Sequence, residues 1–164
     1  MMEITASQAM WFLPPVLPIA LWIAYSDLKF MKITNKSLYV LLAVFVITGL
    51  IALPFETFLW RLAQMVVVLA IGFVANALRL IGGGDAKYAA AIALFVAFQD
   101  AKIILLIFAA MLVATYVTHR MFSKIGPVRR LTADWASWTS GNKFPMGLAL
   151  SGTFLAYLAI PLFS

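Results

Sequence analysis

The chain has 164 residues, of which 65% are hydrophobic and only 11% are charged, and its mean hydropathy is +1.02. Soluble domains are about half apolar and about a quarter charged, so this composition excludes a soluble domain and predicts one integral-membrane domain over residues 1–164. Cysteine is absent and histidine occurs once, so we expect no disulfide, no metal and no cofactor. The net charge of +6 favours contact with anionic lipid headgroups over nucleic acid, because no basic run alternates with aromatic residues.

Six uncharged stretches follow one another along the chain. A straight helix needs about 20 residues to cross the hydrocarbon core, and five of the stretches approach that length with their flanks. The fourth stretch is short, and it must either borrow residues from the glycine-rich turn before it or sit in a thinned region. We therefore predict an all-α polytopic bundle of about six transmembrane helices. The stretches are Ile4–Ser26, Ser37–Phe55, Leu62–Leu78, Tyr88–Gln99, Ile103–His119 and Phe144–Ser164.

The basic residues predict how these helices are oriented. Cytoplasmic loops of membrane proteins carry an excess of Lys and Arg. With both termini outside the cytoplasm, only Arg61 and Lys102 of the 12 basic residues face out, and the opposite orientation inverts the ratio. The prediction is N-out and C-out. The residues then placed in the cytoplasm are Lys29, Lys32, Lys36, Arg79, Lys87, Arg120, Lys124, Arg129, Arg130 and Lys143.

Two acids stand at the ends of apolar stretches on the same predicted side. Asp27 follows the first stretch, and Asp85 precedes the fourth directly after three glycines, Gly82, Gly83 and Gly84. Two crossings separate the acids, which returns the chain to the cytoplasmic face. An ionised carboxylate at such a boundary is costly and usually functional. Packing of the first, third and fourth helices would bring the two carboxylates together.

Structural roles compete with this interpretation. Asp27 would be an ordinary loop residue, and Asp85 would be a helix N-cap, a position that Asp favours. The glycines weigh against that view, because glycine is costly in a helix. Their bare backbone is free to leave helical geometry and to let an extended substrate segment approach. We assign no chemistry to the other acids, which lie near predicted water boundaries: Glu3, Glu56, Asp100 and Asp134.

Three segments in this order resemble a known family. They are Asp27-Leu28-Lys29 followed by Ile33-Thr34-Asn35, then Gly82-Gly83-Gly84-Asp85-Ala86-Lys87, and finally Pro145-Met146-Gly147-Leu148-Ala149. The pattern resembles the type IV prepilin peptidases, which are intramembrane aspartyl proteases of the GxGD kind, over essentially the whole chain. The G-x-G-D-x-K element is the most specific of the three, and the Pro-x-Gly element is the least. The chain is most similar to the short form that serves tight-adherence (Flp-type) pili.

The resemblance implies that Asp27 and Asp85 are catalytic. Neighbouring carboxylates share a proton, so the ionised one would activate a water as general base while the other protonates the leaving amine. The implied substrate and partner is a pilin precursor, whose leader is cut before its hydrophobic helix at the cytoplasmic face of a bacterial or archaeal cytoplasmic membrane. Longer relatives carry a cytoplasmic segment with Cys-x-x-Cys motifs and also methylate the new N-terminus. Because that segment is absent here, we expect cleavage without methylation.

Two points stay open at this stage. Lys87 either favours ionisation of Asp85 or anchors the helix to lipid headgroups. A small proton- or cation-coupled transporter is the alternative function, since intramembrane acids also mark ion pathways. A transporter would place its acids near the bilayer midplane and often shows an inverted repeat, and neither feature is visible. A purely structural membrane subunit is a third alternative, and it leaves the three glycines unexplained.

Overall fold

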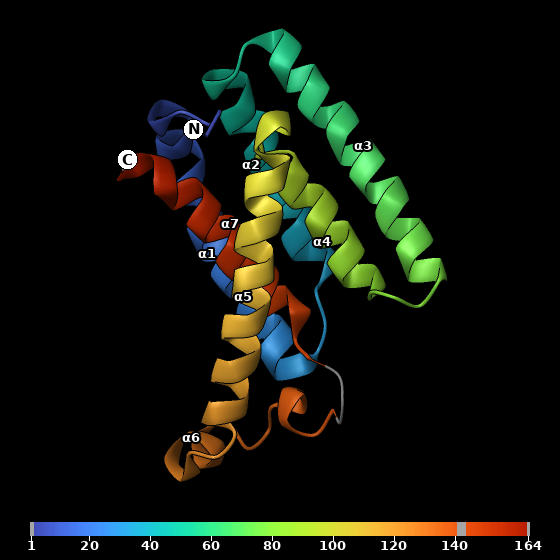
Figure 1. Ribbon diagram of the computed structural model, residues 1–164, viewed down its shortest axis with the longest axis vertical. Helices are drawn as coiled ribbons and strands as arrows, with labels where there is room; N and C mark the ends of the chain where they lie inside the picture. Colours follow the sequence, from blue (N-terminus) through green and yellow to red (C-terminus); the bar gives the residue numbers. More distant parts are fainter. Residues whose placement is uncertain (1, 141–143, 164) are drawn as a thin grey trace.

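The computed structural model describes residues 2–140 and 144–163, and in these two segments every regular element is helical (Figure 1). Helix α1 is preceded by a capping box in which Thr5 and Gln8 exchange hydrogen bonds with each other's backbone N–H. The α-helices are α1 (Ala6–Phe30), α2 (Asn35–Ala52), α3 (Phe55–Ala77), α4 (Gly83–Ala93), α5 (Ala101–Phe122), α6 (Gly126–Leu131) and α7 (Met146–Ala159). The short 3-10 helices are η1 (Phe98–Asp100), η2 (Ala136–Trp138) and η3 (Ile160–Leu162).

The long helices confirm an all-α membrane protein. Helices α1, α2 and α3, and α5 together with η1, are long and apolar enough to cross a membrane, and Met146–Leu162 is a shorter apolar helix. Each of the six predicted apolar stretches overlaps one of the helices α1 to α5 and α7, the fourth only as far as Ala93. Helix α4 has only 11 residues and begins at Gly83, so it does borrow residues from the glycine-rich turn.

Helix α4 is short because the chain leaves helical geometry inside the bundle. The residues after it, Leu94–Ala97, are buried although they form no continuous helix. Side chains of other helices satisfy their backbone: the Gln64 amide donates to the carbonyls of Ala93 and Val96 at 3.1 and 3.2 Å, and the Ala97 N–H donates to the Tyr157 hydroxyl at 3.0 Å. Irregular backbone at membrane depth is tolerated when protein groups satisfy it in this way.

The helices pack around α7 and a cluster of phenylalanines. Helix α1 packs on α7 and α2, α4 lies along α3 and also touches α7 and α2, and α5 leans on α7 (Figure 1). The Phe95 ring, just beyond α4, lies 5.1–5.2 Å from the rings of Phe12, Phe45 and Phe154, so it joins α1, α2 and α7. The expected direct packing of the first helix on the third is therefore wrong, because α1 packs on α7 and α2 while α3 packs on α4.

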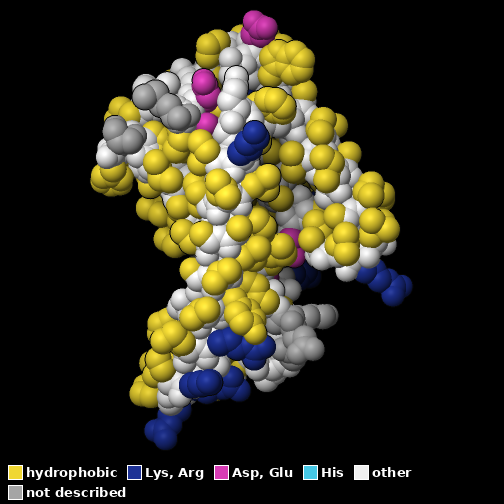
Figure 2. All heavy atoms as spheres, viewed as in Figure 1, with side chains coloured by type: hydrophobic (Ala, Val, Ile, Leu, Met, Phe, Trp, Pro, Cys, Tyr) yellow, Lys and Arg dark blue, Asp and Glu magenta, His cyan; other side chains and the backbone are white. Residues whose placement is uncertain are grey.

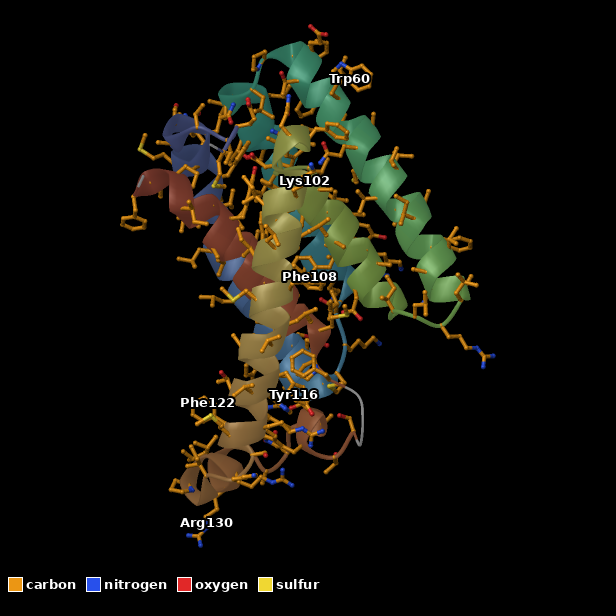
Figure 3. All side chains as sticks on the ribbon, in the orientation of Figure 1. Trp60, Lys102, Phe108, Tyr116, Phe122 and Arg130 are labelled. Atoms are coloured by element: carbon orange, nitrogen blue, oxygen red, sulfur yellow. The ribbon has the colours of Figure 1, made fainter. Side chains whose placement is uncertain are left out.

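Positive side chains gather at one end of the molecule. Figure 2 shows most visible Lys and Arg around the end that carries α6, below a largely apolar body. Lys102 begins α5 at the other end, whereas Tyr116, Phe122 and the α6 residue Arg130 lie toward the basic end (Figure 3). Lys143 falls outside the described residues. The separation of charge has the form that the N-out, C-out prediction requires, and the orientation in a membrane stays a prediction.

Candidate active site

Asp27 lies in the last turn of α1 and only 5% of its surface is exposed. The helix ends at Met31, which adopts a left-handed conformation with φ 52° and donates its N–H to the Asp27 carbonyl at 2.8 Å. A non-glycine residue in this conformation is uncommon, so the turn must be stabilised by its surroundings. The Ser26 hydroxyl contributes to this stabilisation, because it donates a hydrogen bond to the Lys32 carbonyl at 2.8 Å. Asp27 is therefore a buried helix residue rather than an ordinary loop residue.

Gly147 holds the Asp27 carboxylate. Its N–H, in the first turn of α7, donates to Asp27 Oδ2 at 2.7 Å. The N–H groups of a first helical turn have no partner within the helix, and the helix dipole favours a negative charge there. A Cβ at this position would lie 2.9 Å from Asp27 Oδ2 and 3.1 Å from its Cβ and Cγ, so only glycine allows this approach. The Pro-x-Gly element, the least specific in the sequence, thus forms one wall of the site.

Asp85 lies in the first turn of α4 and is half-buried. The N-cap residue is Gly82, and Asp85 is the third helical residue, so the expectation that Asp85 itself would be the cap is wrong. The backbone N–H of Gly82 hydrogen-bonds to the Asp85 carboxylate, which is the return half of a capping box. Asp85 therefore helps to cap α4 through one hydrogen bond, and most of the acceptor positions of its carboxylate remain available for other partners.

The three glycines differ in what surrounds them. A Cβ on Gly82 would lie 2.5 Å from Asp85 Oδ2, and one on Gly84 would lie 3.3 Å from the Ile33 Cβ. A Cβ on Gly83 would meet only the Asn76 amide, at an ordinary contact distance of 3.7 Å. None of the three has a left-handed φ, and Gly83 and Gly84 are helical. Gly82 and Gly84 are therefore explained by close approach and not by the expected departure from helical geometry, whereas no neighbour within the protein requires glycine at position 83.

The fold brings Asp27 and Asp85 together at one end of the bundle. Their negative charges are close enough to interact, although no hydrogen bond joins the two described carboxyl groups. Helices α7 and α2, which both touch α1 and α4, create this proximity. A buried hydrogen bond of 3.0 Å between the Tyr88 and Ser151 hydroxyls fixes α4 to α7 one turn beyond Asp85. Tyr88 was missed in the sequence, where it looks like any aromatic residue of an apolar stretch.

The nearby lysines do not pair with the two acids. Lys87 Nζ donates to the Asn35 side chain at 3.4 Å, and two helical residues place it about 200° around α4 from Asp85. Lys29 Nζ lies 3.1 Å from Asp134 Oδ2, and it holds the pKa of that exposed carboxyl below its usual value. Of the two roles left open for Lys87, contact with headgroups fits this position better than control of Asp85.

A second acid is buried at the opposite end of the bundle. Asp100 is 1% exposed, and it accepts hydrogen bonds from the N–H groups of Glu3 and Ile4, at 2.9 and 3.1 Å, and from the Tyr157 hydroxyl, at 2.7 Å. The charge of Arg61, which is itself only 6% exposed, also interacts with it. We call these residues the Asp100 cluster. Asp100 is therefore enclosed by protein groups, and its expected place near a water boundary of the membrane stays a prediction.

Among the described residues, no group of three His, Cys, Asp or Glu side chains is placed to hold a metal ion.

Comparison with known proteins decides the family. The model of the type IV leader peptidase family matches residues 16–118, more than half of the chain. The chain belongs to the type IV leader peptidase family. The matched region of this leader peptidase contains Asp27 and Asp85 and ends before Gly147. Searches of curated proteins and of solved structures give no significant match.

Proposed function

We propose that this leader peptidase is an aspartic endopeptidase in which Asp27 and Asp85 cleave the leader from type IV pilin precursors, and that these precursors are Flp-type pilins, because the chain resembles the short form of the family that serves such pili. The observation that carries the proposal is the meeting of two acids, 58 positions apart in the sequence, whose carboxylates interact by charge at one end of the bundle. Two such carboxylates can share one proton, which is the arrangement that aspartic proteases use.

The chemistry follows from that shared proton. The ionised carboxylate takes a proton from a water, whose oxygen attacks the carbonyl carbon of the scissile peptide bond. The protonated carboxyl group hydrogen-bonds to the carbonyl oxygen, and a proton then passes to the leaving nitrogen as the C–N bond breaks. Gly147 keeps Asp27 in place and Gly82 keeps Asp85 in place, each through one backbone N–H. No step needs a metal or a methyl donor.

The exposed backbone beside Asp85 is the proposed entry for substrate. Gly82 and Gly83 are both exposed. An extended segment could lie against this backbone while its hydrophobic helix stays in the membrane. The proposed site of cleavage is then the cytoplasmic face of a bacterial or archaeal cytoplasmic membrane, the side on which the basic residues are predicted.

The decisive experiment removes each acid without changing its shape. Asp27→Asn and Asp85→Asn should each lower the rate of precursor cleavage by about 10²–10⁴-fold or more, because an amide cannot alternate between acid and base. The double variant should be no slower than either single variant, since the two residues act as one unit. Cleavage is measured on a purified pilin precursor in detergent, with the folded fraction checked by size-exclusion chromatography.

Glu56→Gln is the matched control, because Glu56 is an exposed acid in the first turn of α3, far from both carboxylates in the fold. It should cleave the precursor at the wild-type rate. Normal processing by well-folded Asp85→Asn protein would end the protease proposal and leave the transporter alternative.

A further inference from the structure

An apolar groove lies between α2 and α3, with α4 as its floor, and has a volume of about 250 Å³. Its depth comes from small side chains on the floor, where longer ones would fill it. We call it the α2–α3 groove. Its apolar walls are formed by Leu38 and Leu42 of α2, Met65 and Leu69 of α3, and Ala90 and Ala91 of α4.

One end of the α2–α3 groove is polar. Lys87 and Asn35 line it there, and the exposed Lys87 ammonium donates to the Asn35 side-chain oxygen at 3.4 Å. That contact brings no negative charge, and no described acid forms an ion pair with Lys87. Lys87 lies in the second turn of α4, at the predicted cytoplasmic headgroup level. The groove therefore combines an apolar channel with an uncompensated positive charge at its mouth.

Its position and lining decide what it can hold. The groove lies on the other side of α4 from Asp85, since Lys87 is about 200° around the helix from it. A pilin helix seated there would have its scissile bond on the wrong face. A hydrocarbon chain of a lipid suits both the apolar lining and the position.

We propose that the α2–α3 groove binds one membrane phospholipid, with an acyl chain between α2 and α3 and the phosphate on Lys87 and the Asn35 amide. An ammonium and a side-chain amide are suitable donors for a phosphate oxygen. The acyl chain supports α4 on the side opposite Asp85, where α3 leans on α4 rather than on α2 (Figure 1). This inference rests on the proposed protease function only where it excludes a pilin helix from the groove.

The test uses a photoreactive lipid. The full chain is placed in nanodiscs of phosphatidylcholine with a small fraction of phosphatidylglycerol that carries a diazirine in its acyl chain, and labelled peptides are mapped by mass spectrometry after irradiation. Labelling at the groove residues of α2 and α3 should exceed that on the lipid-facing side of α5 several-fold. Lys87→Gln should reduce the groove labelling several-fold, whereas Lys102→Gln, at the other end of the molecule, should not.

A second pair of variants tests the acyl chain separately from the phosphate. Leu69→Trp fills the groove from its rim and should suppress labelling there, while Ile71→Trp, on an exposed part of the same helix, should leave it unchanged. Size-exclusion profiles in the nanodiscs confirm folding of each variant. Groove labelling equal to that of α5, or unaffected by both Lys87→Gln and Leu69→Trp, overturns the proposal. Displacement of the lipid by a pilin precursor that cross-links in its place would also overturn it.

Discussion

The acids at the two ends of the bundle differ in how many hydrogen-bond partners they have. Asp100 accepts three hydrogen bonds and has the Arg61 charge nearby, so its acceptor capacity is largely used. Asp27 and Asp85 each accept one backbone N–H, although a carboxylate offers about four acceptor positions. The charge of Asp85 acts on Asp27, and no described Lys or Arg forms an ion pair with either carboxylate. A satisfied buried acid stabilises the fold, while an acid with spare capacity can bind water and move protons.

Gly147→Ala should produce the largest effect short of removing an acid, because the new Cβ would lie 2.9 Å from Asp27 Oδ2. Displacing a catalytic group by about 1 Å can cost on the order of 10²-fold in rate. We expect a loss of that order in kcat for precursor cleavage. Gly152→Ala on the same helix is the control, since its Cβ would meet only the flexible Met111 sulfur at 3.4 Å. Equal rates for the two variants would show that Gly147 does not position Asp27.

Alanine in the glycine triplet should separate positioning from substrate approach. Gly82→Ala pushes on the Asp85 carboxylate at 2.5 Å, so kcat should fall by roughly tenfold or more. The Cβ added by Gly83→Ala would clash with no group of the chain. If the substrate lies along this backbone, the new methyl group should weaken substrate binding and raise KM while kcat stays unchanged. Steady-state cleavage kinetics distinguish the two. The same fall in kcat for both variants would contradict separate roles.

Asp100→Asn should affect stability more than chemistry. The amide removes charge-assisted hydrogen bonds and leaves the buried Arg61 without its counter-charge, at a cost of about 3 kcal/mol in the free energy of unfolding. We expect a lower midpoint of thermal unfolding in detergent, with kcat per folded molecule near that of the wild type. Glu56→Gln provides the control for stability. A collapse of kcat without a change in midpoint would give the Asp100 cluster a catalytic role.

The last prediction concerns which end faces the cytoplasm and changes no activity. The chain has no cysteine, so single cysteines at positions 32, 56, 124 and 164 can each be labelled with an impermeant maleimide on intact cells. Positions 56 and 164 should react, while 32 and 124 should react only after the membrane is broken. Labelling of position 32 without position 56 would place the Asp100 cluster in the cytoplasm and the two catalytic candidates outside it.

Much of the fold could be predicted from sequence because hydropathy is a local property. Each apolar stretch contains a helix, and the short fourth stretch drew on the glycine turn, which was one of its two predicted alternatives. The reason why α4 ends early could not be predicted, since Gln64 and Tyr157, which satisfy the backbone after it, come from other helices. The packing of α1 was missed for the same reason: which apolar faces meet depends on shape, and every face of these helices is similarly apolar.

The sequence by itself determined the membrane class, the helices and the two candidate acids, because charge among apolar residues is visible without any knowledge of contacts. Only the tertiary structure decided which acids have spare acceptors. The amide that holds Asp27 lies 120 residues away at Gly147, and the donors to Asp100 come from the N-terminal segment and from α7. Hydrogen bonds of this kind depend on the distance between folded segments. The sequence could single out Asp85 by its three glycines, but only the structure shows that Asp85 is half-buried with free acceptors while Asp100 is enclosed and satisfied.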